Sequence, residues 1–157
     1  MIRAGCPSRR WGYAAAGWAT AFAIVHLYWA LGGTVGLAES AGRRLADERP
    51  TAFIVGGLYG VALALLVAAA LGAALARSGL TGWRRMLPLF GAGVAAVLLL
   101  RAVVVEVLLL ADVDYGDGAI SADQRWWALV LWNPWFLLGG MVFALAAVAA
   151  RRSSTSR

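Results

Sequence analysis

Lysine is absent from this 157-residue sequence, and cysteine and histidine each occur once. The single cysteine, Cys6, excludes a disulfide, a CxxC redox pair and a cysteine-based metal cluster within these residues. The single histidine, His26, excludes bis-histidine haem ligation and leaves too few ligands for a metal site built from side chains alone. We therefore expect no metal and no cofactor.

Charged residues are also scarce, at 14% of the chain, whereas 62% of the residues are hydrophobic and the mean hydropathy is +0.75. The formal net charge of +6 comes from 14 arginines, which stand mainly at the ends of apolar runs and form no basic patch. This balance predicts an integral protein of the cell membrane, with membrane lipids as partners and no nucleic acid.

Four apolar runs are each long enough to cross roughly 30 Å of hydrocarbon as a helix of about 20 residues. They cover residues 12–37, 51–76, 86–110 and 126–150 and are joined by short polar connections. The first run exceeds the roughly 7–15 apolar residues of a signal peptide, so we expect it to be retained. The sequence therefore predicts an all-α fold, a four-helix membrane bundle that forms a single domain over residues 1–157.

The arginines are divided unevenly between the two ends of such a bundle. Nine lie in the N-terminal segment, the second connection and the C-terminal segment, against four in the first and third connections. Cytoplasmic loops of membrane proteins carry the excess of basic residues. We therefore expect both termini to be cytoplasmic.

Small residues mark the faces where helices pack closely in lipid. Gly32 and Gly36 form a GxxxG motif in the first run, and Gly56 and Gly60 form another in the second. Because the first connection joins these two ends, we expect a close helix hairpin there. Two further pairs are candidates for the third and fourth helices: Gly91 with Ala95, and Gly140 with Ala144.

Four polar side chains inside the runs, one on each helix, fall at a common depth. At about 1.5 Å per residue they lie roughly 10–14 Å below the outer surface, and they are His26, Tyr59, Arg101 and Asn133. A charged residue this deep usually faces the bundle interior, and an arginine that snorkels outward is the alternative. We expect Arg101 to point inward and to reach one of the other three side chains.

Glu106 stands five residues beyond Arg101, about 140° further round the same helix, so the two need not form a simple pair. Two neighbours are possible for Glu106: Arg125, or an apolar wall that keeps the carboxyl protonated.

No Ser lies inside a run, which excludes a rhomboid-like serine dyad, and no HExxH or phosphate-binding loop occurs. Catalysis stays open, and its candidate acid–base residues are His26 and Glu106.

The fourth run contains Trp132, Asn133, Pro134 and Trp135 in succession. Pro134 removes a backbone donor and kinks the helix, and the indoles on either side present flat apolar walls. This predicts a polar pocket walled by tryptophan near the outer leaflet, with a kinked packing joint as the alternative. The candidate ligand-binding residues are His26, Trp29, Tyr59, Arg101, Glu106, Trp132, Asn133 and Trp135.

Two segments, HLYWALGG at 26–33 and WNPWFLLGG at 132–140, resemble those of a bacterial family of small four-helix membrane proteins of unknown function. The resemblance implies the four-helix plan and the pairing of His26 with the Asn-Pro segment, and it implies no activity. Three functions therefore stay open: a pocket that binds a lipid or small amphiphile, a structural or accessory subunit with a protein partner or a second copy, and a small proton-coupled exporter that uses Glu106.

Overall fold

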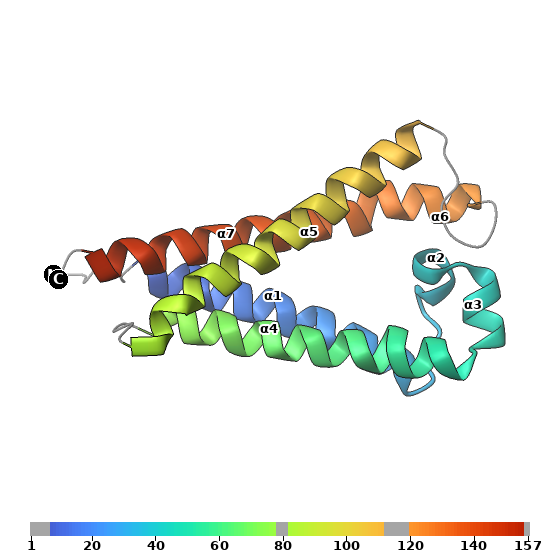
Figure 1. The fold of residues 1–157 in the computed structure, drawn as a ribbon. Coiled ribbons are helices and arrows are strands. Elements are labelled where there is room, and N and C mark those ends of the chain that lie inside the picture. Colours follow the sequence, from blue (N-terminus) through green and yellow to red (C-terminus); the bar gives the residue numbers. More distant parts are fainter. Residues whose placement is uncertain (1–6, 78–81, 112–119, 156–157) are drawn as a thin grey trace, which may run out of the picture.

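The computed structural model describes residues 7–77, 82–111 and 120–155. These residues form helices and no strands, so the predicted all-α fold is confirmed (Figure 1). The long elements are α1 (Pro7–Ala30), η1 (Phe53–Gly60) running into α4 (Val61–Ala76), α5 (Leu87–Leu110), and α6 (Ala122–Trp127) running through η3 (Ala128–Trp132) into α7 (Asn133–Thr155). Three stretches are long and apolar enough to cross a membrane: Phe53–Ala76, Leu87–Leu110 and Ala122–Ser153.

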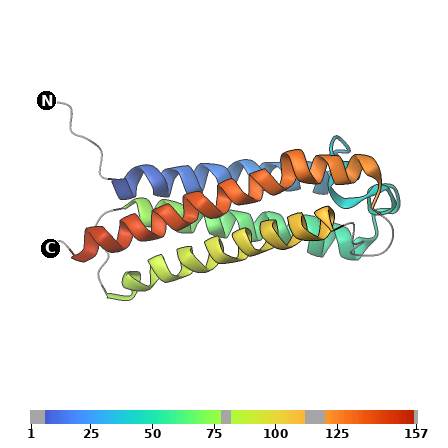
Figure 2. The same cartoon turned by 90° about the horizontal axis from the view of Figure 1, so that it is seen from above.

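The long helices form two antiparallel pairs, α1 with α4 and α5 with α7, and α1 also packs along α7. At the terminal end, where α1 begins and α7 ends, the pairs lie close together and the short 3-10 helix η2 (Gly82–Met86) precedes α5. Toward the opposite, cap end the pairs spread apart (Figure 1). The short helices α2 (Leu37–Ala41) and α3 (Arg43–Glu48) lie at this end, with α2 next to α6 (Figures 1 and 2).

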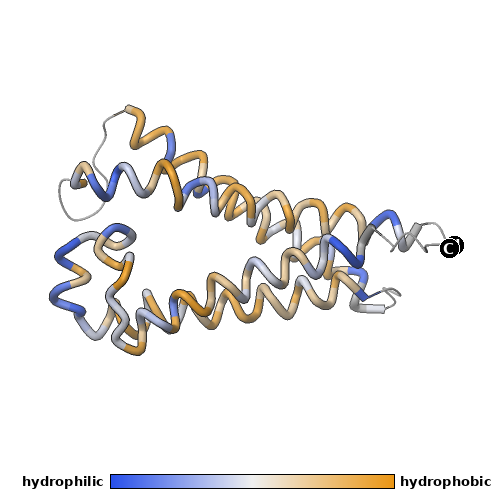
Figure 3. Tube along the Cα trace, turned by 180° about the vertical axis from the view of Figure 1, so that it is seen from behind, coloured by the Kyte–Doolittle hydropathy of each residue, from blue (hydrophilic) through white to orange (hydrophobic). Residues whose placement is uncertain are grey.

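Hydrophilic residues gather at both ends of the bundle, and hydrophobic residues fill the length between them (Figure 3). Large apolar side chains such as Leu63, Val97 and Leu100 are mostly exposed. The buried core instead contains many alanines, together with Trp18, Phe22 and Phe143. An apolar surface around a small-residue core is typical of helices that pack in lipid.

The close approach of α1 and α4 lies at the terminal end and not at the predicted GxxxG hairpin. A methyl group built at Gly72 would lie 2.7 Å from the backbone nitrogen of Ala16, and one at Gly12 would lie 2.5 Å from that of Ala76. At Gly56, by contrast, no atom lies within 4 Å. The prediction that the GxxxG glycines mediate the close contact was therefore wrong, because the tightest backbone contacts lie at the other ends of these helices.

The first predicted helix ends at Ala30, seven residues earlier than expected. Gly32 and Gly36 adopt positive φ angles of 109° and 77°, which a continuing helix does not allow, so both belong to a turn. Arg49 closes this end of α1 by donating hydrogen bonds to the carbonyls of Trp29 and Gly33. The first connection is thus a folded cap, whereas most of the acidic third connection lies outside the described residues.

Three of the four small residues predicted to pack the third and fourth helices, Gly91, Ala95 and Gly140, lie at their interface. A methyl group at Gly140 would lie 3.3 Å from the carbonyl oxygen of Ala95, and one at Gly91 would lie 3.4 Å from the side chain of Ala147. These contacts join α5 to α7 along their length. In the last apolar stretch, the α-helical hydrogen-bond pattern is interrupted by η3, a π-helical segment that directly precedes Asn133 and Pro134.

Candidate functional site

Asn133, the first residue of α7, is fully buried and links two charged residues of α5. Its Oδ1 accepts a hydrogen bond of 3.1 Å from Nη1 of Arg101. Its Nδ2 donates a bond of 2.6 Å to Oε2 of Glu106. One buried amide therefore bridges an arginine and a glutamate of α5 within the apolar length of the bundle.

The geometry of α5 explains how both side chains reach one partner. Ala102 is buried, and at 100° per residue Arg101 lies about 100° to one side of it while Glu106 lies about 40° to the other. The two side chains thus flank the buried face of α5. The guanidinium carbon of Arg101 also lies 3.7 Å from the ring centroid of Phe136, so a cation–π contact adds to the hydrogen bond.

The prediction that Arg101 reaches one of the level polar residues is confirmed by this contact with Asn133. Glu106 accepts its bond from Asn133, and Arg125 donates a bond of 2.7 Å to the carbonyl of Leu109 near the end of α5. The sequence did not predict this bridge. Arg101 and Glu106 are five residues apart on different faces of one helix, so their spacing does not indicate that Asn133 on another helix bonds both.

His26 is held by its own helix. Its Nδ1 lies 3.0 Å from the carbonyl oxygen of Phe22, and because a carbonyl only accepts, Nδ1 carries the hydrogen. The imidazole meets the rings of Phe22 and Trp29 edge-on, at centroid distances of 4.6 Å and 5.3 Å. His26 therefore lies within an aromatic cluster with Phe22 and Trp29.

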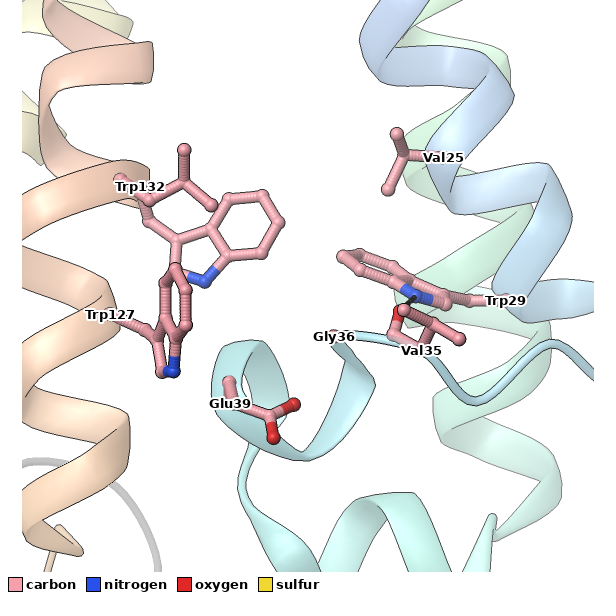
Figure 4. Close-up of a pocket in the computed structure, with 8 residues that line it drawn as sticks. Val25, Trp29, Val35, Gly36, Glu39, Trp127 and Trp132 are labelled. Atoms are coloured by element: carbon pink, nitrogen blue, oxygen red, sulfur yellow. Dashed lines mark hydrogen bonds between the residues drawn. The ribbon is translucent and has the colours of Figure 1, made fainter.

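The first cavity, which we call the Trp-walled pocket, has a volume of about 380 Å³ and lies at the cap end. Trp29 of α1 and Trp132 of η3 both line it and contact each other edge-on, with ring centroids 5.7 Å apart and planes inclined by 66° (Figure 4). Trp29 is fixed because its Nε1 donates a bond of 2.8 Å to the carbonyl of Val35. The lining residues are Val25, Trp29, Val35, Gly36, Glu39, Trp127, Leu131 and Trp132.

The second cavity, which we call the α4–α5 cavity, has a volume of about 610 Å³. Its lining residues are apolar except for His26, and most come from α4 and α5, two helices that make few contacts with each other. They are Phe22, His26, Val61, Ala64, Leu65, Ala68, Leu89, Phe90, Gly93, Val94, Val97, Leu98 and Phe136. This cavity offers space for an apolar chain.

The eight candidate residues are thus distributed over several places. Arg101 lines neither cavity, and Tyr59 is 41% exposed on η1 and lines neither of them either. Trp135 stacks on Trp18 at a centroid distance of 5.8 Å, inside the core. Arg101 and Glu106 both bond Asn133. Separately, Trp29 contacts Trp132.

Of the eight residues that line the Trp-walled pocket, only Trp29 and Trp132 were sequence candidates, and the chemically important additions are Glu39 and Trp127. Trp127 lies at the start of the fourth apolar run, and Glu39 lies in the first polar connection. The signal available in the sequence was the pair of glycines that flank α2, Gly36 and Gly42, because glycine readily adopts the positive φ angles that turn α2 back toward the bundle.

Among the described residues, no three His, Cys, Asp or Glu side chains cluster as a metal site requires.

Comparison with known protein families gives one match. A family described as a protein of unknown function, DUF3995, matches residues 19–143, well over half of the chain. The chain belongs to the DUF3995 family. Its matched range includes both segments, 26–33 and 132–140, on which the resemblance to a family of unknown function was based, and that resemblance is confirmed. No curated protein and no solved structure matches significantly.

Proposed function

We propose that this DUF3995 chain is a four-span membrane protein that binds a lipid or small amphiphile in the Trp-walled pocket. Besides the three apolar stretches, α1 has 24 residues, or about 36 Å at 1.5 Å per residue, which exceeds the hydrocarbon thickness. It is less apolar than the other three because it includes residues such as Thr20 and His26. Its packing along α4 and α7 supports its assignment as the fourth span.

The unequal arginine distribution supports an orientation with both termini in the cytoplasm. Arg9, Arg10, Arg77, Arg151 and Arg152 lie at the terminal end, and this end holds most of the basic residues. In this orientation the cap end faces outward. The Trp-walled pocket then lies near the outer leaflet, where amphiphiles present their headgroups.

One observation carries the proposed binding function. Trp29 and Trp132 are far apart in the sequence, yet their rings wall one cavity of about 380 Å³. Small-molecule sites measure roughly 300–1,000 Å³ and combine apolar walls with few polar groups. This pocket has mainly apolar walls and a single carboxylate, a combination that suits a molecule with an apolar body and a polar end.

The bridge between Arg101, Asn133 and Glu106 favours a second candidate function, that of a structural or accessory subunit. Each of these side chains has a hydrogen-bond partner within the bundle, and the bridge joins α5 to α7. Such a bridge stabilises one helix arrangement without any ligand. We therefore assign these three residues to the architecture and place binding at the Trp-walled pocket.

Filling the pocket tests the binding function. Val25 faces the pocket from α1, whereas its neighbour Ile24 is 60% exposed and lines neither cavity (Figure 4). Full-length protein is loaded with a photoactivatable phospholipid, and bound lipid is counted by native mass spectrometry. We expect Val25→Phe to lose the bound lipid and Ile24→Phe to keep it. Equal retention by both variants would reject the Trp-walled pocket as the binding site.

A further inference from the structure

Glu39 is the only charged residue among the eight that line the Trp-walled pocket. It lies on α2, between Gly36 and Gly42, whose φ angles of 77° and 88° turn the chain on either side of this short helix. Its carboxylate stands below the indoles of Trp127 and Trp132 and across from Trp29 (Figure 4). A carboxylate and three indole rings thus line the same pocket.

This carboxylate has no protein counter-charge in the described part of the chain. None of the residues described there forms a hydrogen bond or an ion pair with the side chain of Glu39, which is partly buried. A carboxylate in a partly apolar setting is stabilised when an opposite charge approaches it. The charge of Glu39 therefore favours a cationic ligand over a neutral or anionic one.

The three tryptophans favour the same charge by a different interaction. The face of an indole ring carries a negative potential, and tryptophan is the aromatic residue that binds cations best. Trp29 and Trp132 are inclined to each other by 66°, and the hydrogen bond to Val35 holds Trp29 in place. Walls that are rigid before binding lower the entropy cost of holding a ligand.

From these observations we infer that the Trp-walled pocket binds an organic ammonium ion, with the methylated nitrogen against the indole walls and the charge balanced by Glu39. A single carboxylate without further oxygen ligands suits such an ion better than a bare metal cation. The inference rests on the proposed function in that it names the polar end of the bound molecule. The ammonium group belongs either to a lipid headgroup or to a free cation, and the two sources share this chemistry.

The charge requirement is tested with choline and its uncharged isostere 3,3-dimethylbutan-1-ol. Binding to the full chain, in nanodiscs of phosphatidylglycerol at low salt, is measured by calorimetry. We expect choline to bind and the alcohol to bind roughly tenfold more weakly, because the alcohol lacks the cation–π and carboxylate attraction. Equal affinities for the two molecules would overturn the inference.

Two matched pairs of variants locate the site. Glu39→Gln removes the charge in the pocket, and Glu48→Gln removes the same charge from the exposed face of α3. Trp127→Leu removes a pocket wall, and Trp126→Leu changes the neighbouring indole, which is 62% exposed and does not line the pocket. We expect the first member of each pair to weaken ammonium binding roughly tenfold and the second to leave it unchanged. Equal effects within either pair would contradict the assignment.

An experiment with lipids distinguishes a lipid headgroup from a free cation as the source of the ammonium group. It also tests this inference independently of the proposed lipid binding. Native mass spectrometry compares retention of phosphatidylcholine and phosphatidylglycerol with identical chains. Preferential retention of phosphatidylcholine that depends on Glu39 identifies a lipid headgroup, whereas choline binding without lipid retention identifies a free cation and rejects a lipid as the ligand. Equal retention of both lipids, lost in Val25→Phe, would overturn the ammonium inference and leave lipid binding standing.

Discussion

Asn133 and Glu106 are joined by a hydrogen bond of 2.6 Å from Nδ2 to Oε2, between the first residue of α7 and the middle of the cap-end half of α5. The same amide accepts from Arg101 through its Oδ1, so both of its polar atoms are used. In an apolar environment an unpaired charge or amide is costly, whereas a satisfied bridge specifies how two helices meet. Asn133 therefore determines the pairing of α5 with α7 at this level.

The first prediction concerns this bridge. Asn133→Leu keeps a similar volume but leaves Arg101 and Glu106 without their shared partner, so we expect the unfolding free energy to fall by about 2–4 kcal/mol. Equilibrium unfolding in mixed micelles measures the loss. Arg101→Met and Asn133→Leu should also be non-additive when combined, because they remove the same hydrogen bond. Strict additivity would show that the two residues act independently.

The second prediction concerns the contact of α1 with α4. Gly72→Leu places a side chain against the backbone of Ala16 and Gly12, so we expect a loss of about 1–3 kcal/mol or more from overpacking. Gly56→Leu is the matched control, since no atom lies within 4 Å of a methyl group built there. Thermal unfolding in detergent compares the two. A larger loss for Gly56→Leu would place the helix contact at the cap end after all.

The third prediction concerns the α4–α5 cavity. Gly93 lines this cavity and has open space around a built methyl group, so Gly93→Leu should fill the cavity and leave the fold intact. Gly17→Leu adds the same side chain at an exposed position on α1, where there is also open space. We expect only Gly93→Leu to reduce labelling of Phe90 or Val97 by a photoactivatable fatty acid, read by peptide mass spectrometry. Undiminished labelling would mean that the cavity holds no apolar chain.

The fourth prediction concerns orientation. With Cys6 replaced by Ser, single cysteines are introduced at Glu48 on the exposed cap and at Ser154 near the end of α7. We expect a membrane-impermeant thiol reagent applied to intact cells to label position 48 and to reach position 154 only after permeabilisation. The reverse pattern would invert the proposed topology and place the Trp-walled pocket on the cytoplasmic side.

The sequence by itself determined the features that depend on local composition. The apolar runs at 51–76 and 86–110 match the observed helices closely, since helix length in lipid follows from hydrophobic thickness and rise per residue. The contact of Arg101 with a polar residue on another helix was also predictable, because a charge deep in an apolar helix requires a partner, although its side chain stays exposed and does not point into the bundle as expected. A residue type and its depth were sufficient for these inferences.

Only the tertiary structure decided how the glycines are used and where Glu39 lies. A pair of small residues four positions apart has the same sequence pattern whether its glycine packs against a helix, as Gly72 does, or reverses the chain at positive φ, as Gly36 does. That difference depends on contacts with residues distant in sequence, which no local pattern contains. For the same reason a glutamate in a polar connection became part of a tryptophan-walled pocket: the turn at Gly36 placed α2 against helices from both halves of the chain.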